Sequence, residues 1–120
     1  MTMNTKLKIS LGDEALDGVL FDSPTARDFA SLLPLSMSLK DFNRAEKISD
    51  LPKKLSTQQA PAGAEPVTGD IAYYVPWGNL ALFYNGAPFA NGLVIIGRID
   101  GGTNVLQAND AIEARIEIIP

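Results

Sequence analysis

The aromatic side chains of this chain are concentrated in one stretch, and they are the residues best suited to holding a ligand. Residues 69–84 read GDIAYYVPWGNLALFY and contain the single Trp, all three Tyr and one of the five Phe. Aromatic rings around a concave surface can accept a proline ring, a flat ligand or a peptide side chain. Trp77 follows Pro76 at a bend, and its indole N–H needs a partner, so we place Trp77 at the mouth of a pocket.

The paired aromatic residues of this stretch must point in different directions. Tyr73 and Tyr74 are neighbours, and neighbouring residues of a strand face opposite sides of a sheet. The same holds for Phe83 and Tyr84, so one member of each pair faces outward or lines a pocket mouth. A competing interpretation, that these rings fill a core and plug one end of the fold, carries slightly more weight.

Two arginines are the cations best placed for binding. An Arg beside an apolar pocket can hold a carbonyl or carboxylate group, or polarise a prolyl amide. Arg98 lies in the apolar run LVIIGRID and is expected to point outward, with pairing to Asp100 as the alternative. Arg44 lies in a polar turn, where it is most simply solvated, although loops often carry binding residues. The candidate ligand-binding residues are Phe42, Arg44, Tyr73, Trp77, Asn79, Phe83 and Arg98.

Several kinds of chemistry are excluded by composition. The chain has no His and no Cys, so a Ser-His-Asp triad, a thiolate nucleophile and a His- or Cys-bearing zinc site are all impossible. Glu113, Arg115 and Glu117 share one face of a strand and are expected to form a solvated, charge-balanced surface. The glycines follow no phosphate-binding spacing. The sequence therefore predicts no metal and no cofactor.

Length and charge limit the classes of partner. The chain has 120 residues, which fits a single domain over 1–120, and a net charge of −4 with the charges scattered. An acidic chain without a basic stripe is a poor partner for nucleic acid. The N-terminal residues lack the apolar region of a signal peptide, and no run approaches 18 apolar residues. We therefore expect a cytoplasmic protein that does not interact with membranes.

The first third of the chain predicts a hairpin followed by a short helix. Apolar and polar residues alternate through residues 6–21, with Gly12-Asp13 as the turn signal. Ser23 and Pro24 suit the N-cap and first position of a helix over about 24–33, which Pro34 ends. Thr25 is among the residues expected to face solvent. A helix this short must pack on something, and an open barrel end is the natural place.

The remaining elements are predicted to be strands joined by two irregular loops. The loops cover residues 52–69 and 85–92, and a bulge or sharp curvature is expected at Gly97. About seven or eight strands and one helix indicate an all-β barrel or sandwich, and a helix capping one end favours the barrel. The expected strands lie in residues 35–40, 46–51, 71–75, 80–84, 93–99 and 112–118.

With these elements identified, the sequence resembles the small bacterial cyclophilin-like domain family. The resemblance is carried by stretches that make up about half of the chain, in collinear order. It implies a closed eight-stranded cyclophilin-like barrel capped by a helix. Members of this family sometimes occur fused to or beside flavodoxin-like domains. The stretches that carry the resemblance are DSPTARDFASLLPLSMSLKDF (22–42), EKISDLPKKLS (46–56), GDIAYYVPWGNLALFY (69–84) and GLVIIGRIDGG (92–102).

The resemblance carries over no catalytic residue. Prolyl isomerase cyclophilins use an Arg, then a Phe, then a Gln-Gly-Gly-Asp run, with a Trp and a His on the pocket wall. This chain lacks His and Gln-Gly-Gly-Asp, and Phe42 precedes Arg44. We expect a module that binds a small molecule or peptide segment near Trp77 and the two loops. The alternatives are an atypical peptidyl-prolyl isomerase, which needs no proton transfer, and an interaction protein whose partner is of flavodoxin type or another kind.

Overall fold

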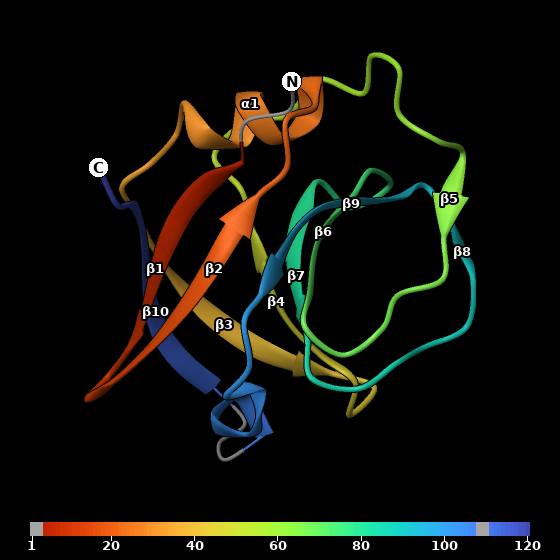
Figure 1. The fold of residues 1–120 in the computed structure, drawn as a ribbon. Coiled ribbons are helices and arrows are strands. Elements are labelled where there is room, and N and C mark those ends of the chain that lie inside the picture. Colours follow the sequence, from red (N-terminus) through yellow and green to blue (C-terminus); the bar gives the residue numbers. More distant parts are fainter. Residues whose placement is uncertain (1–3, 108–110) are drawn as a thin grey trace.

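The computed structural model describes residues 4–107 and 111–120, and its main feature is a closed antiparallel barrel of eight strands (Figure 1). Around the barrel the strands follow the order β1-β10-β3-β4-β7-β6-β9-β2. The strands are β1 (Thr5–Leu11), β2 (Glu14–Leu20), β3 (Leu35–Phe42), β4 (Glu46–Asp50), β5 (Gly63–Ala64), β6 (Asp70–Tyr74), β7 (Asn79–Phe83), β8 (Ala90–Asn91), β9 (Leu93–Ile99) and β10 (Ala111–Ile118). One α-helix, α1 (Pro24–Ala30), and one 3-10 helix, η1 (Thr103–Gln107), complete the described elements. The predicted all-β barrel with a short helix is confirmed.

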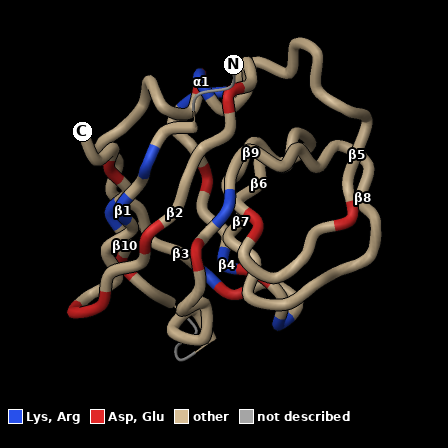
Figure 2. Tube along the Cα trace, viewed as in Figure 1, with Lys and Arg blue, Asp and Glu red and all other residues tan. Residues whose placement is uncertain are grey.

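Alternation along each strand separates an inner core from an outer face. In β1, Leu7, Ile9 and Leu11 are buried inside the barrel, whereas Lys6 and Lys8 are exposed. This is the period of two that the sequence predicts for a strand with one wet face. Within residues 4–107 and 111–120, charged residues are distributed along the barrel strands and do not gather into one basic patch (Figure 2). None of the helices in the described part of the chain is long and apolar enough to cross a membrane.

Helix α1 closes one end of the barrel. The Oγ of Ser23 accepts a hydrogen bond from the Ala26 N–H at 3.2 Å, as predicted for the N-cap. Ala26 and Phe29 are completely buried in the barrel core. The helix ends at Ala30 rather than near residue 33. The N–H groups of Leu32 and Leu33 donate to the Phe29 and Ala30 carbonyls three residues back, so the chain continues as a tighter turn before Pro34.

Thr25 corrects one sequence expectation. We predicted that Thr25 faces solvent, but the residue is 1% exposed and its hydroxyl donates to the Ser56 carbonyl at 2.6 Å. The backbone N–H of Ser56 in turn donates to the Asp28 carboxylate at 2.7 Å, and Lys53 pairs with the same side chain at 2.9 Å. The start of the 52–69 loop therefore packs over α1. It covers a helix face that the periodicity of the sequence predicts to be exposed to solvent.

Strand β9 contains the predicted irregularity at Gly97. Its pairing with β6 shifts register, because Ile71 opposes Gly97 whereas Ala72 opposes Ile95. A Cβ atom at Gly97 would lie 2.2 Å from the carbonyl oxygen of Val19 in β2. Only glycine allows the two backbones to approach this closely. The bulge bends β9 so that it can pair with both β6 and β2 and close the barrel.

The two loops form a second layer outside the barrel, which we call the outer cover and define as residues 61–69 and 85–92. It is not wholly irregular as predicted, because β5 and β8 pair within it and stand away from the barrel wall in Figure 1. The Gly92 N–H donates to the Ala62 carbonyl at 2.7 Å, which holds the two segments together. Between the cover and the barrel lies a small apolar cluster that contains Ala72, Ala81, Phe83 and Leu93.

Candidate functional site

A pocket of about 220 Å³ opens between the outer face of the barrel and the outer cover. Its floor comes from outward-facing residues of β3, β4, β6, β7 and β9, and its rim comes from the cover and the β6–β7 turn. The pocket therefore lies at the edge of the outer apolar cluster, away from the barrel core. The described residues that line it are Phe42, Asn43, Glu46, Pro66, Tyr74, Trp77, Asn79, Phe83, Ala87, Pro88, Ala90 and Leu93.

Three aromatic rings meet at one end of the pocket. The ring of Trp77 contacts Phe42 edge to face, with centroids 5.2 Å apart and planes at 90°. It contacts Tyr74 in the same way, at 5.3 Å and 81°. Such edge-to-face pairs are a favoured geometry for aromatic rings. Trp77 nevertheless stays 54% exposed, so a large apolar surface remains uncovered at the pocket mouth.

The turn that carries Trp77 is fixed by its own backbone. The Gly78 N–H donates to the Tyr74 carbonyl at 2.9 Å, and Gly78 has a φ of 65°. Glycine adopts this left-handed conformation at little cost. Strand β6 therefore ends at Tyr74 and β7 begins at Asn79, with Trp77 at the tip between them. The local sequence thus places a bulky ring on a tight turn, where packing does not hide it.

Asn79 supplies a buried polar group on the pocket wall. The residue is 2% exposed, and its Oδ1 atom has no hydrogen-bond partner among the described residues. A buried carbonyl oxygen without a partner is costly, and most buried polar atoms in folded proteins are paired. This oxygen is thus a polar atom of the pocket lining that still needs a donor.

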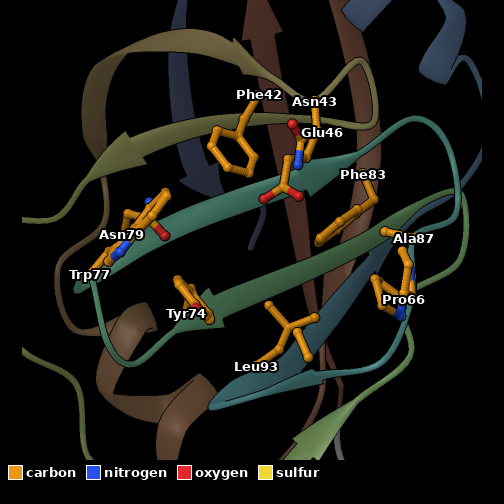
Figure 3. Close-up of a pocket in the computed structure, with 12 residues that line it drawn as sticks. Phe42, Asn43, Glu46, Pro66, Tyr74, Trp77, Asn79, Phe83, Ala87 and Leu93 are labelled. Atoms are coloured by element: carbon orange, nitrogen blue, oxygen red, sulfur yellow. The ribbon is translucent and has the colours of Figure 1, made fainter.

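Glu46 brings a carboxylate into the same space. Figure 3 shows its carboxylate directed into the region framed by Phe42, Tyr74 and Phe83. Partial burial, and secondarily the negative charge of Asp41, raise the pKa of Glu46 from 4.5 to about 7. Near neutral pH this side chain is therefore divided between its charged and uncharged forms.

Asp41 and Lys47 form an ion pair behind Glu46. Lys47 is 1% exposed, and its Nζ donates to Asp41 Oδ1 at 3.1 Å and lies 5.7 Å from the centre of the Tyr84 ring. The Tyr84 hydroxyl donates to the same carboxylate oxygen. Burial raises the pKa of Asp41, but the hydrogen bonds from Tyr84 and Lys47 outweigh it, and the net pKa is lowered. Lys47 is thus engaged on the inner side of β4, while Glu46 faces the pocket.

The structure brings together four of the seven predicted ligand-binding residues. Phe42, Trp77, Asn79 and Phe83 all line the pocket. Tyr73 lies elsewhere, because it points into the barrel core, where its hydroxyl accepts a hydrogen bond from the Leu55 N–H at 3.1 Å. Its neighbour Tyr74 lines the pocket instead. Phe83 and Tyr84 separate in the same way, because Phe83 belongs to the outer apolar cluster and Tyr84 to the barrel core.

The two arginines are not among the described residues that line the pocket. Arg98 is exposed on β9 and opposes Val19 and Asp70 in the flanking strands. Arg44 is exposed in the β3–β4 turn, where its φ is 53° and its backbone N–H donates to Asp41 Oδ2 at 3.2 Å. The outward orientation predicted for Arg98 agrees with its exposure.

Sequence reasoning missed Tyr74 and Glu46 as members of this site. Tyr74 was one of two indistinguishable neighbours, and the choice depended on which face of β6 meets the barrel core. Glu46 begins a strand whose alternation places it on the same face as Ile48, but nothing local shows that this face meets Phe83. Among the described residues, no group of three acidic side chains is arranged to hold a metal ion.

Comparison with known proteins gives a matching family and similarity to solved structures. The model of a family described as cyclophilin-like matches residues 9–117. The solution structure of a hypothetical protein from Archaeoglobus fulgidus superimposes with a TM-score of 0.70 and 21% sequence identity, covering 99% of this chain and 98% of that chain. At that identity the likeness concerns the fold alone. A search of curated protein sequences gave no significant match.

Proposed function

This chain belongs to the cyclophilin-like family, and we propose that it serves as a binding module whose outer pocket accepts a small molecule or a peptide segment. The proposal rests chiefly on one observation. Trp77 stays 54% exposed at the mouth of a pocket that also contains the unpartnered Oδ1 of Asn79. An unsatisfied buried acceptor is costly in a free protein, and a donor from an occupant would relieve that cost. The same occupant would cover apolar surface of the exposed indole ring.

The chemistry of the pocket wall supports a ring-shaped or compact apolar group. Aromatic and aliphatic side chains form most of the lining, with Asn43, Glu46 and Asn79 as the polar groups. Mostly apolar pockets with a few polar groups are typical of ligand sites. The volume of about 220 Å³ is below the range of about 300–1,000 Å³ that is common for drug-sized ligands, so one ring or head group fits best.

The isomerase alternative has less support. A prolyl isomerase of this kind would need an Arg to polarise the prolyl amide, and neither Arg44 nor Arg98 is among the described residues of the lining. Exchange NMR of an Xaa-Pro peptide tests this alternative directly. Uncatalysed exchange takes tens to hundreds of seconds, so acceleration by a catalytic amount of protein would be evident.

The single Trp provides a direct binding assay. We expect saturable changes in Trp77 fluorescence when phenol or N-acetyl-proline methylamide is titrated into the protein. Ala87→Leu adds bulk to the pocket wall and is expected to weaken binding at least about tenfold, equivalent to about 1.4 kcal/mol. Ala62→Leu places the same side chain at an exposed position of the outer cover and serves as the matched control.

Two results would contradict the proposal. One is the lack of a saturable change with either probe in the wild-type protein. The other is an equal affinity of the Ala87→Leu and Ala62→Leu variants for a probe. The occupied site would then lie outside the pocket. Circular dichroism and thermal melting of both variants check that the barrel is intact before affinities are compared.

A further inference from the structure

The polar groups of the pocket that accept hydrogen bonds are not balanced by positive charge. Glu46 contributes a carboxylate and Asn79 an unpartnered amide oxygen, and no Lys or Arg is found among the described residues of the lining. Lys47 follows Glu46 in the chain, but it faces the other side of β4 and pairs with Asp41. The pocket therefore has the polarity that suits a cation or a strong donor.

The aromatic rings have the arrangement that recognises organic cations. The Trp77 ring stands at 90° to Phe42 and at 81° to Tyr74, and all three rings line the same pocket. The face of an aromatic ring is negative, and a desolvated cation within about 6 Å of the ring centre gains roughly 0.5–2 kcal/mol. Several rings beside one carboxylate give an alkylammonium group apolar contact and charge compensation together.

We propose that the outer pocket recognises the alkylated ammonium group of a small molecule, held between Phe42, Tyr74 and Trp77 and neutralised by Glu46. This inference rests on the proposed binding function and names its ligand class. An N–H of a partly alkylated ammonium, or a hydroxyl close to the cation, would donate to Asn79 Oδ1. A quaternary head group needs only the rings and the carboxylate, and the small pocket admits the head group while the rest of the ligand extends past Trp77.

The surroundings of Glu46 determine how such binding depends on pH. The charged groups near it are Asp41 of β3, Arg44 in the preceding turn and Lys47 of its own strand, whereas β7 contributes no charged residue. Burial and Asp41 raise the pKa of Glu46 to about 7. A bound cation favours the carboxylate, so cation affinity rises as the pH increases through about 7 and falls as Glu46 becomes protonated.

The test compares choline with the uncharged alcohol in which carbon replaces the quaternary nitrogen. The two probes have nearly the same shape, so their difference reports charge. By isothermal titration calorimetry at low salt and about pH 8, we expect choline to bind roughly tenfold more tightly than the alcohol. Glu46→Gln should reduce this preference about fivefold or more, and so should lowering the pH of the wild-type protein to about 6. Glu14→Gln makes the same charge change at an exposed hairpin residue and should have no such effect.

Each other outcome has a definite meaning. Equal or tighter binding of the uncharged alcohol overturns the cation inference and leaves the binding proposal standing. A preference for choline that Glu46→Gln does not reduce overturns the role of that carboxylate. Failure of both probes, while phenol or the proline amide still changes Trp77 fluorescence, overturns the cation inference alone. Failure of all four probes overturns the proposed function as well.

Discussion

At the scale of single residues, the outer pocket places two polar groups among apolar ones. Glu46 lies against aromatic rings, and Asn79 keeps an unpartnered oxygen on the same wall. Both features carry a free-energy cost in the unliganded protein. Residues that reduce stability without a structural benefit are candidates for function. These costs favour the outer pocket as the binding site. In the barrel core, by contrast, the Tyr73 hydroxyl already accepts a hydrogen bond from the Leu55 N–H.

The raised pKa of Glu46 predicts how stability changes with pH. The folded state favours the protonated carboxyl, so it binds more protons than the unfolded state between pH 4.5 and about 7. The stabilisation that the protonated Glu46 side chain gives the folded state is therefore complete below pH 4.5, and it is lost as the pH rises through about 7. Allowing for solvent screening of a partly exposed group, we expect the free energy of unfolding to fall by roughly 1–2 kcal/mol across this window.

Urea unfolding at a series of pH values measures this effect. Glu46→Gln cannot titrate and should flatten the profile between about pH 5 and pH 7.5. Asp41 has a lowered pKa, so its contribution is present above its unfolded value of 3.8 and is lost at lower pH, outside this window. A wild-type stability that rises from about pH 5 to pH 7.5 would contradict the burial of the Glu46 carboxyl group.

At the scale of elements, alternation along strands accounts for most of what the sequence predicts correctly. It placed β1, β2, β3 and β10, and it required Tyr73 and Tyr74 to separate. The remaining features depend on contacts between distant segments. The burial of Thr25 follows from a hydrogen bond to Ser56, and the two-residue strands β5 and β8 are too short to leave a local pattern. No periodicity within one element reports such contacts.

The bulge at Gly97 leads to an element-scale prediction. Gly97→Ala would place a methyl group 2.2 Å from the Val19 carbonyl, so β2 and β9 must move apart or the barrel must open. We expect a loss of about 2–3 kcal/mol in the free energy of unfolding, typical of overpacking. Gly86→Ala is the matched control, because its nearest contact would be the Pro66 carbonyl at 3.5 Å.

Thermal and urea unfolding of the two glycine variants check this prediction. Gly86→Ala should lie within about 0.5 kcal/mol of the wild-type protein, as surface substitutions usually do. Equal stabilities for Gly97→Ala and Gly86→Ala would contradict the close approach of β2 and β9. Steric crowding against β2 would then not explain why position 97 holds a glycine.

At the scale of the whole molecule, the protein is a barrel with a second layer on one side. The barrel core is filled by its own side chains, and α1 closes one end. The outer cover then leaves a pocket against β6, β7 and β9. The sequence located this region through Trp77 and the two loops. It could not identify the floor of the pocket, because Glu46, Phe83 and Leu93 come together only when the barrel closes.

Heteronuclear NMR of the labelled protein titrated with choline and with phenol tests the binding role of the outer pocket most directly. We predict saturable shifts of the Trp77 indole N–H, the Asn79 side-chain amide and the backbone of residues 85–92, with little change at Leu55 and Phe29 beside the barrel core. Shifts centred on α1 and the barrel core, or no saturable shifts with either probe, would contradict the claim that the outer pocket is the binding site.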